Sequence, residues 1–266
     1  MIDLRSNILD GTDCGPQSFA ESIAMCRIAA ALGVRILVAT PLWKAGSSEP
    51  PLSFEEINRK VERLERELSG TPFIRSGFVL EFSKQLPELA DVYGSRLALG
   101  GKHHLLISLP STYLPTGTDE IWAGLRQRGF LVILAHPECS PAIRRHPALL
   151  NRWASIGVKF QIDAASVSGA YGREVRKFAL ECLLKYDDCT VIASNARDTK
   201  ANPMEDARRE ISARLGELRA AKFVTGTPTA ILDDGFITAN GKSKDSGKVG
   251  SLLRSLKQIK TIVSEA

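Results

Sequence analysis

Short apolar runs alternate with amphipathic segments along most of this chain, and that alternation limits the fold more than any other feature of the sequence. Residues 35–41 (RILVATP) are continuously apolar in their middle, which is typical of a parallel strand covered on both faces. Ser18 with Glu21, and Ser53 with Glu56, have the spacing of capping boxes and predict two helix starts. Strands that alternate with helices predict an α/β fold with a parallel sheet.

The alternation continues to about residue 220. Further strands are predicted at residues 2–4, 73–82, 104–109, 130–135, 158–162 and 190–193, and further helices at 86–93, 118–128, 141–155, 172–186 and 203–220. About seven strand–helix units with short links favour a closed or nearly closed parallel barrel over two separate domains. We therefore expect a single domain over residues 1–234.

Charge and composition exclude one class of partner. A chain of 266 residues, of which 44% are hydrophobic, can bury a full core. The formal net charge is +5, but residues 235–266 hold six Lys/Arg against two Asp/Glu, a surplus of four. The remainder is near neutral, whereas a nucleic-acid-binding body needs basic residues clustered on one face. We expect no nucleic-acid partner.

The first residues and the cysteines indicate a reducing compartment. The chain starts without a basic segment leading into an apolar one, and no apolar run reaches the ~18 residues that suggest a membrane span. Five cysteines, an odd number, form no CxxC pair, so neither a disulfide framework nor a zinc knuckle is indicated. We expect a cytoplasmic protein with reduced thiols.

The C-terminal segment has its own composition. Residues 235–250 are rich in Gly, Ser and Lys and predict a flexible linker. Residues 251–266 predict a basic amphipathic helix, with an apolar stripe of Leu252, Leu253, Leu256, Ile259, Ile262 and Val263. Such a helix binds an anionic membrane surface or a partner, or packs on the barrel, and the sequence leaves these alternatives open.

In a parallel α/β barrel, chemistry takes place in the loops at the carboxyl ends of the strands. Here those loops are predicted to begin at Arg5, Leu42, Val79, Ser108, His136, Asp163 and Asn195.

Four of these strand ends carry motifs of a known family. They read Met-Ile-Asp followed by Gly-Thr-Asp-Cys-Gly-Pro-Gln, Val-Ala-Thr-Pro41, Leu-Ala-His136-Pro-Glu138 and Ile-Ala-Ser194-Asn-Ala-Arg197, with further matches at 161–169 and 227–232. The chain resembles the PHP-type (CpsB-type) protein-tyrosine phosphatases of bacterial capsule and exopolysaccharide operons. The resemblance implies a distorted seven-stranded (β/α)7 barrel. It also implies a cluster of two or three metal ions, commonly manganese, that removes phosphate from tyrosines of a partner kinase.

The departures from the family pattern concern its metal and phosphate ligands. Where the family has ligands, this chain has Arg5, Asn7, Leu42, Val79, Ser108, Asn195 and Arg197, and Cys139 and Asn202 replace two phosphate-binding arginines. His136 is the only ligand retained, and the other retained rim residues are Asp3, Asp13, Glu138, Gln161 and Asp163. A di- or trinuclear site needs more ligands than these. We therefore expect no metal and no other cofactor.

The two arginines at former ligand positions have two interpretations. Arg5 and Arg197 stand where the family has imidazoles, and two guanidinium groups can bind phosphate bidentately. They would then form an anion pocket that holds phosphotyrosine. Alternatively, they pair with Asp3, Asp13, Asp163 or Glu138 and fill a vacated cavity.

Two side chains suggest residual catalysis. His136 is a candidate general base or ligand to one metal, although an isolated histidine is more often a packing residue. Cys139 and Arg145 have the spacing of a cysteine-dependent phosphatase loop, but the segment between them lacks glycine and contains Pro141.

The sequence thus predicts a catalytically impaired pseudophosphatase that acts as a regulatory or kinase-binding protein in polysaccharide synthesis. Its partner would be a bacterial tyrosine kinase or the phosphotyrosine tail of that kinase. One alternative is an active phosphatase with a reduced or rebuilt site around His136, Asp13 and Glu138. Another is a structural subunit of a polysaccharide assembly. The oligomeric state is not indicated by the sequence.

Overall fold

The structure is a computed structural model that describes residues 1–200 and 202–233. The linker predicted at 235–250 and the helix predicted at 251–266 lie outside the described residues.

Two parallel sheets form the centre of the described chain. One sheet has the order β1 (Ile2–Ser6), β2 (Ile36–Ala39) and β4 (Phe73–Ser76), and the other has the order β3 (Leu42–Trp43), β5 (Val79–Glu81), β6 (His104–Ser108), β7 (Leu131–Ala135), β8 (Lys159–Asp163) and β9 (Thr190–Ala193). Every strand pair in both sheets is parallel. The predicted α/β class with a parallel sheet is confirmed.

Two predicted strands are each interrupted, and both interruptions divide the chain between the sheets. Residues 35–41 end as β2 before Pro41, which has no N–H to donate, and β3 follows it. Residues 73–82 break at Gly77, where an added Cβ would lie 3.0 Å from the Cα of Leu99. The two breaks lie side by side, because Gly77 N donates to Ala39 O at 3.0 Å and Val79 N donates to Pro41 O at 3.2 Å.

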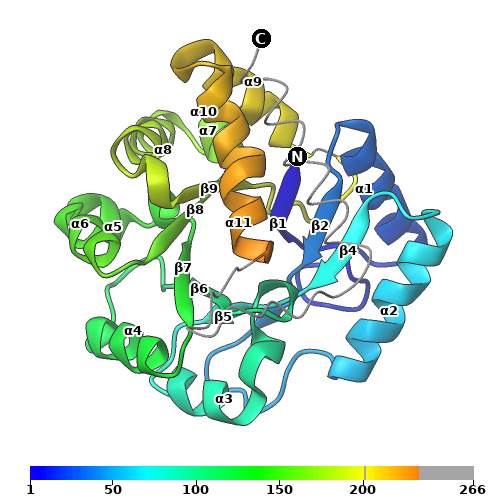
Figure 1. The fold of residues 1–266 in the computed structure, drawn as a ribbon, viewed down its shortest axis with the longest axis horizontal. Helices are drawn as coiled ribbons and strands as arrows, with labels where there is room; N and C mark the ends of the chain where they lie inside the picture. The colour runs from blue at the N-terminus through cyan, green and yellow to red at the C-terminus, as the bar shows by residue number, and fades with distance from the viewer. Residues whose placement is uncertain (201, 234–266) are drawn as a thin grey trace, which may run out of the picture.

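Helices pack around the strands, and the last of them lies in front of the strands at the centre of the view (Figure 1). They are α1 (Phe19–Ala31), α2 (Phe54–Glu67), α3 (Leu86–Tyr93), α4 (Thr118–Gln127), α5 (Pro141–Arg145), α6 (Ala148–Ser155), α7 (Ala164–Ser168), α8 (Arg173–Lys185), α9 (Met204–Leu215), α10 (Glu217–Ala221) and α11 (Thr227–Asp233). Two segments predicted as single helices are each divided. Pro147 separates α5 from α6, and Gly216, with a φ of 87°, separates α9 from α10.

The predicted helix starts at Ser18 and Ser53 are confirmed, although only one of them is a complete capping box. Ser53 Oγ accepts from Glu56 N at 3.2 Å, and the Glu56 carboxylate accepts from Ser53 N at 2.9 Å. Ser18 Oγ accepts from Glu21 N at 3.3 Å. The Glu21 carboxylate, however, accepts from Gln17 N and not from Ser18 N, so the box is incomplete.

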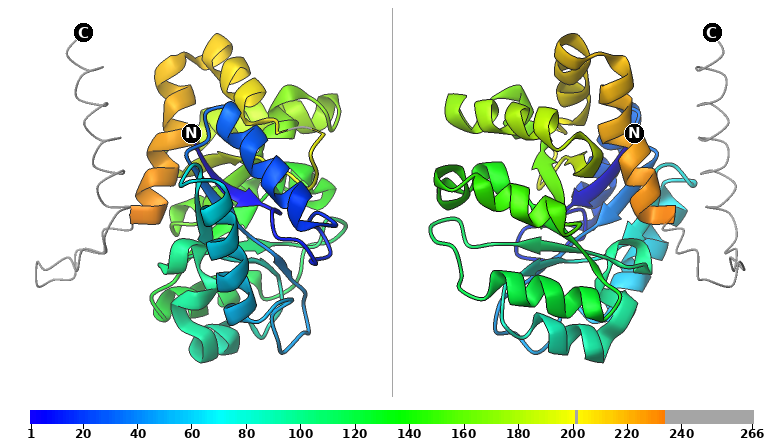
Figure 2. Two further views of the ribbon diagram at one scale, coloured as in Figure 1. Left: turned by 90° about the vertical axis from the view of Figure 1, so that its right-hand side faces the viewer. Right: turned by 60° about the vertical axis from the view of Figure 1, so that its left-hand side comes forward.

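One apolar cluster fills the space between the strands and also includes α11. Its buried members are Ile2, Leu4, Ile36, Val38, Val79, Leu99, Leu106, Ile133, Ala135, Val191, Ile231 and Leu232. Ile231 and Leu232 belong to α11, which lies beside the start of β1 (Figures 1 and 2). Because α11 covers the end at which the strands begin, the opposite end is left for a site.

A second, larger cluster packs the helices against the outer faces of the strands, with Trp122, Trp153 and Phe160 fully buried in it. Among residues 1–200 and 202–233, every helix is too short or too polar to cross a membrane. The five cysteines are free thiols.

Candidate functional site

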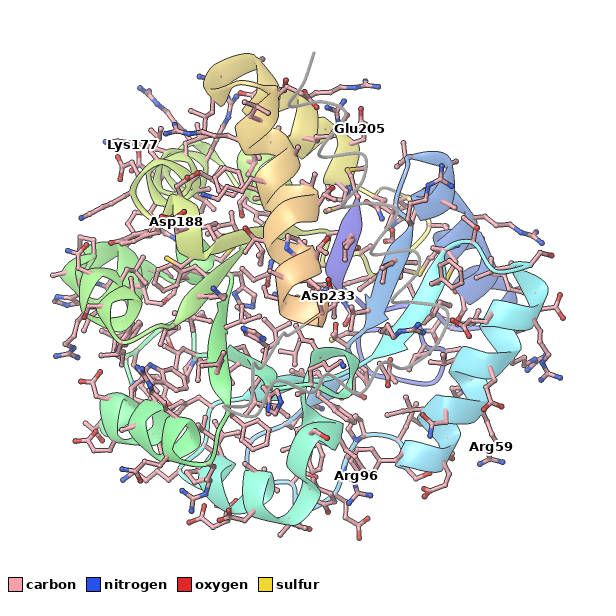
Figure 3. All side chains as sticks on the ribbon, viewed as in Figure 1. Arg59, Arg96, Lys177, Asp188, Glu205 and Asp233 are labelled. Atoms are coloured by element: carbon pink, nitrogen blue, oxygen red, sulfur yellow. The ribbon has the colours of Figure 1, made fainter. Side chains whose placement is uncertain are left out.

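Charged side chains on the helices, such as Arg59 and Lys177, point outward at the edge of the molecule (Figure 3). Four ionisable side chains of β1, β8 and the turn after β7 are buried instead. Asp3, Arg5, Glu138 and Asp163 are at most 5% exposed. Buried charges are costly unless they are paired, so this cluster is the strongest candidate for a site.

Arg5, near the end of β1, is held by two residues of β8. Its Nη1 donates to Gln161 Oε1 at 3.1 Å and lies 3.4 Å from Asp163 Oδ1. Its Nε is buried and has no hydrogen-bond partner among the described residues. Of the acidic partners considered for Arg5 from the sequence, the structure places Asp163 against it.

Asp163 accepts hydrogen bonds from the ends of two other strands and from a residue of its own strand. Besides Arg5, its Oδ1 accepts from Gln161 Nε2 at 2.7 Å, and its Oδ2 accepts from Asn195 Nδ2 at 2.9 Å. The Asn195 side chain in turn accepts from Asn7 Nδ2 at 3.3 Å. Four polar candidates from the sequence thus form one network with Asp163.

Asp3 fixes the backbone beside this network. Its carboxylate accepts from Arg5 N at 3.2 Å, from Ser194 N at 2.9 Å and from Ser194 Oγ at 2.5 Å. Burial raises the pKa of Asp3 to about 6, although the hydrogen bonds from Ser194 and Arg5 oppose that rise. Asp3 therefore joins β1 to the end of β9.

Glu138, Cys139 and Asp163 form a group able to hold a metal ion. One ligand atom from each lies within 4.8 Å of the others. Glu138 Oε1 accepts from Asp163 N at 2.9 Å and from Ser166 Oγ at 2.7 Å, whereas its Oε2 is buried with no partner among the described residues. Burial, followed by the charge of Asp163, raises the pKa of Glu138 to about 8. A cation here would compensate the buried negative charge.

The donor set of this group fits one ion. Two carboxylates and a thiolate are ligands that borderline divalent metals accept, and a bound ion of this kind lowers the pKa of water and neutralises phosphate charge. The group does not fit a bridged cluster of two or three ions. Val79 belongs to the apolar cluster, Leu42 packs against it, and Ser108 is not part of the group.

Two residues that follow strands have strained backbones. His136, after β7, has a φ of 37°, and Asn195, after β9, has a φ of 50°. His136 N donates to Gln161 O at 2.7 Å, and its O accepts from Cys139 N at 3.0 Å. Burial, followed by the Arg5 charge, lowers the pKa of His136 to about 4, so the imidazole is neutral at pH 7. Left-handed residues other than glycine are uncommon and cluster at functional sites.

The remaining candidates are exposed or have other contacts. Arg197 is exposed, but its charge acts on the network, since it contributes to lowering the pKa of Arg5 and of His136. Asp13 forms an exposed ion pair with Lys44. Asn202 accepts from Met204 N at 3.1 Å at the start of α9. Burial raises the pKa of Cys139 to about 12, which is opposite to what a nucleophilic cysteine requires.

Sequence reasoning missed three residues of the site. Ser166 and Ser194 hold the Glu138 and Asp3 carboxylates, and both lie in segments that matched the family motifs. Tyr171 is 47% exposed, and burial followed by the charges of Asp163 and Cys139 raises its pKa, which places the phenol beside the site. No signal in the sequence singled out Tyr171.

Comparisons with known proteins give relatives of one kind. The tyrosine-protein phosphatase YwqE of Bacillus subtilis is 28% identical over 202 residues, which is 75% of this chain and 78% of YwqE. The tyrosine-protein phosphatase CpsB of Streptococcus pneumoniae is 26% identical over 255 residues, which is 89% of this chain and 100% of CpsB.

Solved structures share the fold. One, from work on YwqE and CpsB described as "unique metal-dependent tyrosine phosphatases", superposes with a TM-score of 0.78 at 24% identity, over 88% of this chain and 95% of the solved chain.

The prediction that the chain takes no metal cofactor is wrong. The structure brings Glu138, Cys139 and Asp163 together as a candidate metal group, and the proteins that share the fold are described as metal-dependent. The prediction considered only the family's ligand positions, among which His136 was thought to be the one retained. The group that the structure forms lies at the neighbouring ends of β7 and β8 and does not include His136.

The match to a family covers the whole described chain. A sequence model described as "Capsular polysaccharide synthesis, CpsB/CapC" matches residues 1–233. The same span holds the strands, the helices and the buried strand-end network. On this evidence, the chain belongs to the CpsB/CapC family of capsular polysaccharide synthesis proteins.

Proposed function

We propose that this chain binds phosphotyrosine at the strand-end network and turns it over slowly or not at all, as a pseudophosphatase that regulates polysaccharide synthesis. The observation that carries the proposal is the place of Arg5. Its guanidinium lies at the end of β1, with Nη1 bound to Gln161 and Asp163 and with a buried Nε that lacks a partner. A phosphate that enters here meets a fixed guanidinium where the family motif has an imidazole.

The candidate metal group supports reduced turnover. Glu138, Cys139 and Asp163 would hold one ion, which would supply Lewis acidity beside the phosphate. A hydroxide that bridges two metal ions needs protein ligands around each ion. Leu42 and Val79 cannot supply such ligands, because they contribute only apolar contacts. The chain's own residues are therefore suited to bind and orient phosphate more than to activate water.

The family supports the biological setting. The relatives YwqE and CpsB are tyrosine-protein phosphatases, and the description of the family names capsular polysaccharide synthesis. We place the partner among bacterial tyrosine kinases, with a phosphotyrosine segment as the ligand. We place its action in the cytoplasm, where free thiols persist.

We further propose that the two sheets are parts of one distorted seven-stranded barrel, with β2 continuing into β3 and β4 into β5. Backbone hydrogen bonds join the sheets at the other side: Asn195 N donates to Arg5 O at 2.9 Å, and Asn7 N donates to Ala196 O at 2.9 Å. A bridge between Ser6 and Ala196 also supports this closure.

The test combines binding and turnover in one sample. The full chain, with manganese added, is titrated into a labelled phosphotyrosine peptide and assayed for phosphate release. Binding without turnover, weakened at least tenfold in the Arg5→Ala, Arg197→Ala double variant, is the expected result. Binding that persists unchanged in that variant would remove the anion pocket. Equal affinity for the peptide with and without phosphate would favour the alternative in which the chain is a structural subunit.

A second candidate function is an active phosphatase with a rebuilt site. The observation in its favour is the neutral, strained His136 immediately before the candidate metal group. Turnover that disappears in His136→Ala, while peptide binding is kept, would establish this second function and refute the first.

A further inference from the structure

An apolar groove with a basic border lies next to the candidate site, and nothing described so far uses it. Its volume is about 680 Å³. Leu114, Pro147, Ala148 and Leu149 supply its apolar lining, and Arg145, His146 and Arg152 supply its basic lining. The groove thus lies between the loop that joins β6 to α4 and the segment that joins α5 to α6.

Two hydrogen bonds connect the walls of the groove to the site. Ser140 Oγ, directly after Cys139, donates to Ser111 O at 3.1 Å and so holds the β6–α4 loop against α5. Arg144 Nη1 donates to Glu138 O at 2.6 Å. A peptide bound at the candidate site therefore has the groove within reach of its neighbouring residues.

The charge of the groove selects an acidic occupant. Arg145 is exposed and has no hydrogen bond or ion pair within residues 1–200 and 202–233. Arg152 is also exposed and pairs with Asp119 at 2.7 Å, which leaves the Arg145 charge uncompensated. The N-terminus of α6 begins at Ala148 without a side-chain cap, and the positive end of the helix dipole adds to the same field.

The same charge selects against a basic occupant, which the exposed Arg145 and Arg152 would repel. Tyr113, next to Leu114 in the sequence, is 60% exposed. Apolar lining with an unpaired basic border fits an apolar side chain flanked by carboxylates.

We propose that this groove binds the residues adjacent to the phosphotyrosine of a partner protein, and that it selects an apolar side chain with acidic neighbours. The inference rests on the proposed phosphotyrosine binding and adds the sequence preference of the ligand. Recognition outside the phosphate site would distinguish one phosphorylated segment from another, which a phosphate pocket alone does not do.

The experiment compares three peptides by fluorescence anisotropy with the full chain. The first carries phosphotyrosine with a Glu-Leu-Glu extension on either side, the second has Gly-Ser in place of the extension, and the third is the extended peptide without phosphate. We expect the first peptide to bind about tenfold more tightly than the second. Arg145→Glu should remove that advantage without changing the affinity for the second peptide. Ala148→Trp, which fills the groove without changing charge, should do the same.

Arg59→Glu is the matched control, since Arg59 is an exposed arginine on α2, far from α5 and α6 in Figure 3. It should leave all three affinities unchanged. Equal affinity of the first two peptides for the native chain, or an Arg145→Glu effect no larger than that of Arg59→Glu, would overturn the proposal.

The third peptide separates the two proposals. If the extended peptide without phosphate binds and Arg145→Glu removes the binding, the groove is supported even where the phosphotyrosine site fails. If phosphotyrosine binds but the extension adds nothing, only the groove fails. Binding to anionic phospholipid vesicles that Arg145→Glu removes, without any preference among the peptides, would assign the groove to a membrane and refute a peptide ligand.

Discussion

Arg5 Nη1 lies 3.4 Å from Asp163 Oδ1, and the two side chains are only 6% and 3% exposed. This pair joins β1 to β8, strands that are not neighbours in either sheet. The Arg5 guanidinium thus supplies a positive charge to a carboxylate that would otherwise be buried alone.

Removing one member of this pair should be costly. Arg5→Ala leaves Asp163 buried without its cation, and we expect a loss of about 3 kcal/mol in the free energy of unfolding, measured by urea denaturation. The double variant Arg5→Ala, Asp163→Ala should lose less than the sum of the two single variants. Strict additivity would mean that the pair has no energetic coupling.

The candidate metal group gives a prediction on ion binding. We expect about one divalent ion per chain after purification with added manganese or zinc, measured by mass spectrometry. Glu138→Gln should lower that content at least tenfold, because it replaces the unpartnered Oε2 at the group with an amide. Glu81→Gln is the matched control, since Glu81 also ends a strand but accepts from Ala45 N outside the group. Equal ion content in the two variants would count against the assignment of Glu138.

The pKa of Asp3 predicts a pH dependence of stability. Burial raises that pKa from 3.8 to about 6, so the folded chain binds a proton more tightly than the unfolded chain does. The resulting stability is present below pH 3.8 and is lost as pH rises through about 6. Relative to the native chain, Asp3→Asn should therefore be more stable at pH 7 than at pH 3.5, by about 3 kcal/mol. A difference between Asp3→Asn and the native chain that stays the same at both pH values would contradict the assignment.

The place of α11 predicts the minimal folded unit. A chain truncated after Asp233 should keep the melting temperature of the full chain, because α11 already supplies Ile231 and Leu232 to the apolar cluster that the described residues form between the strands. Ile231→Ala, which removes a fully buried side chain from α11, should cost about 3 kcal/mol. A large loss of stability in the truncated chain would show that residues 234–266 contribute to the fold.

Local sequence patterns predicted much of the fold. Continuous apolar runs such as the one before Pro41 predicted parallel strands, because a strand covered on both faces needs apolar side chains in both directions. Ser53 and Glu56 predicted a helix start, since a capping box involves only residues three apart. The breaks at Gly77 and Pro147 were missed because hydrophobic periodicity runs through them. The break at Gly77 depends on the close approach of the Leu99 backbone, and the break at Pro147 depends on the N–H that proline lacks.

The sequence by itself determined the family and the α/β class, since both depend on motifs and apolar runs that follow one another along the chain. Only the tertiary structure decided that Glu138, Cys139 and Asp163 converge, that Arg5 pairs with Asp163, and that a basic groove lies beside them. The physical reason is that charge pairing and metal binding depend on distances of a few ångströms between strand ends. Those distances follow from the register of β1, β7, β8 and β9, which no local pattern specifies.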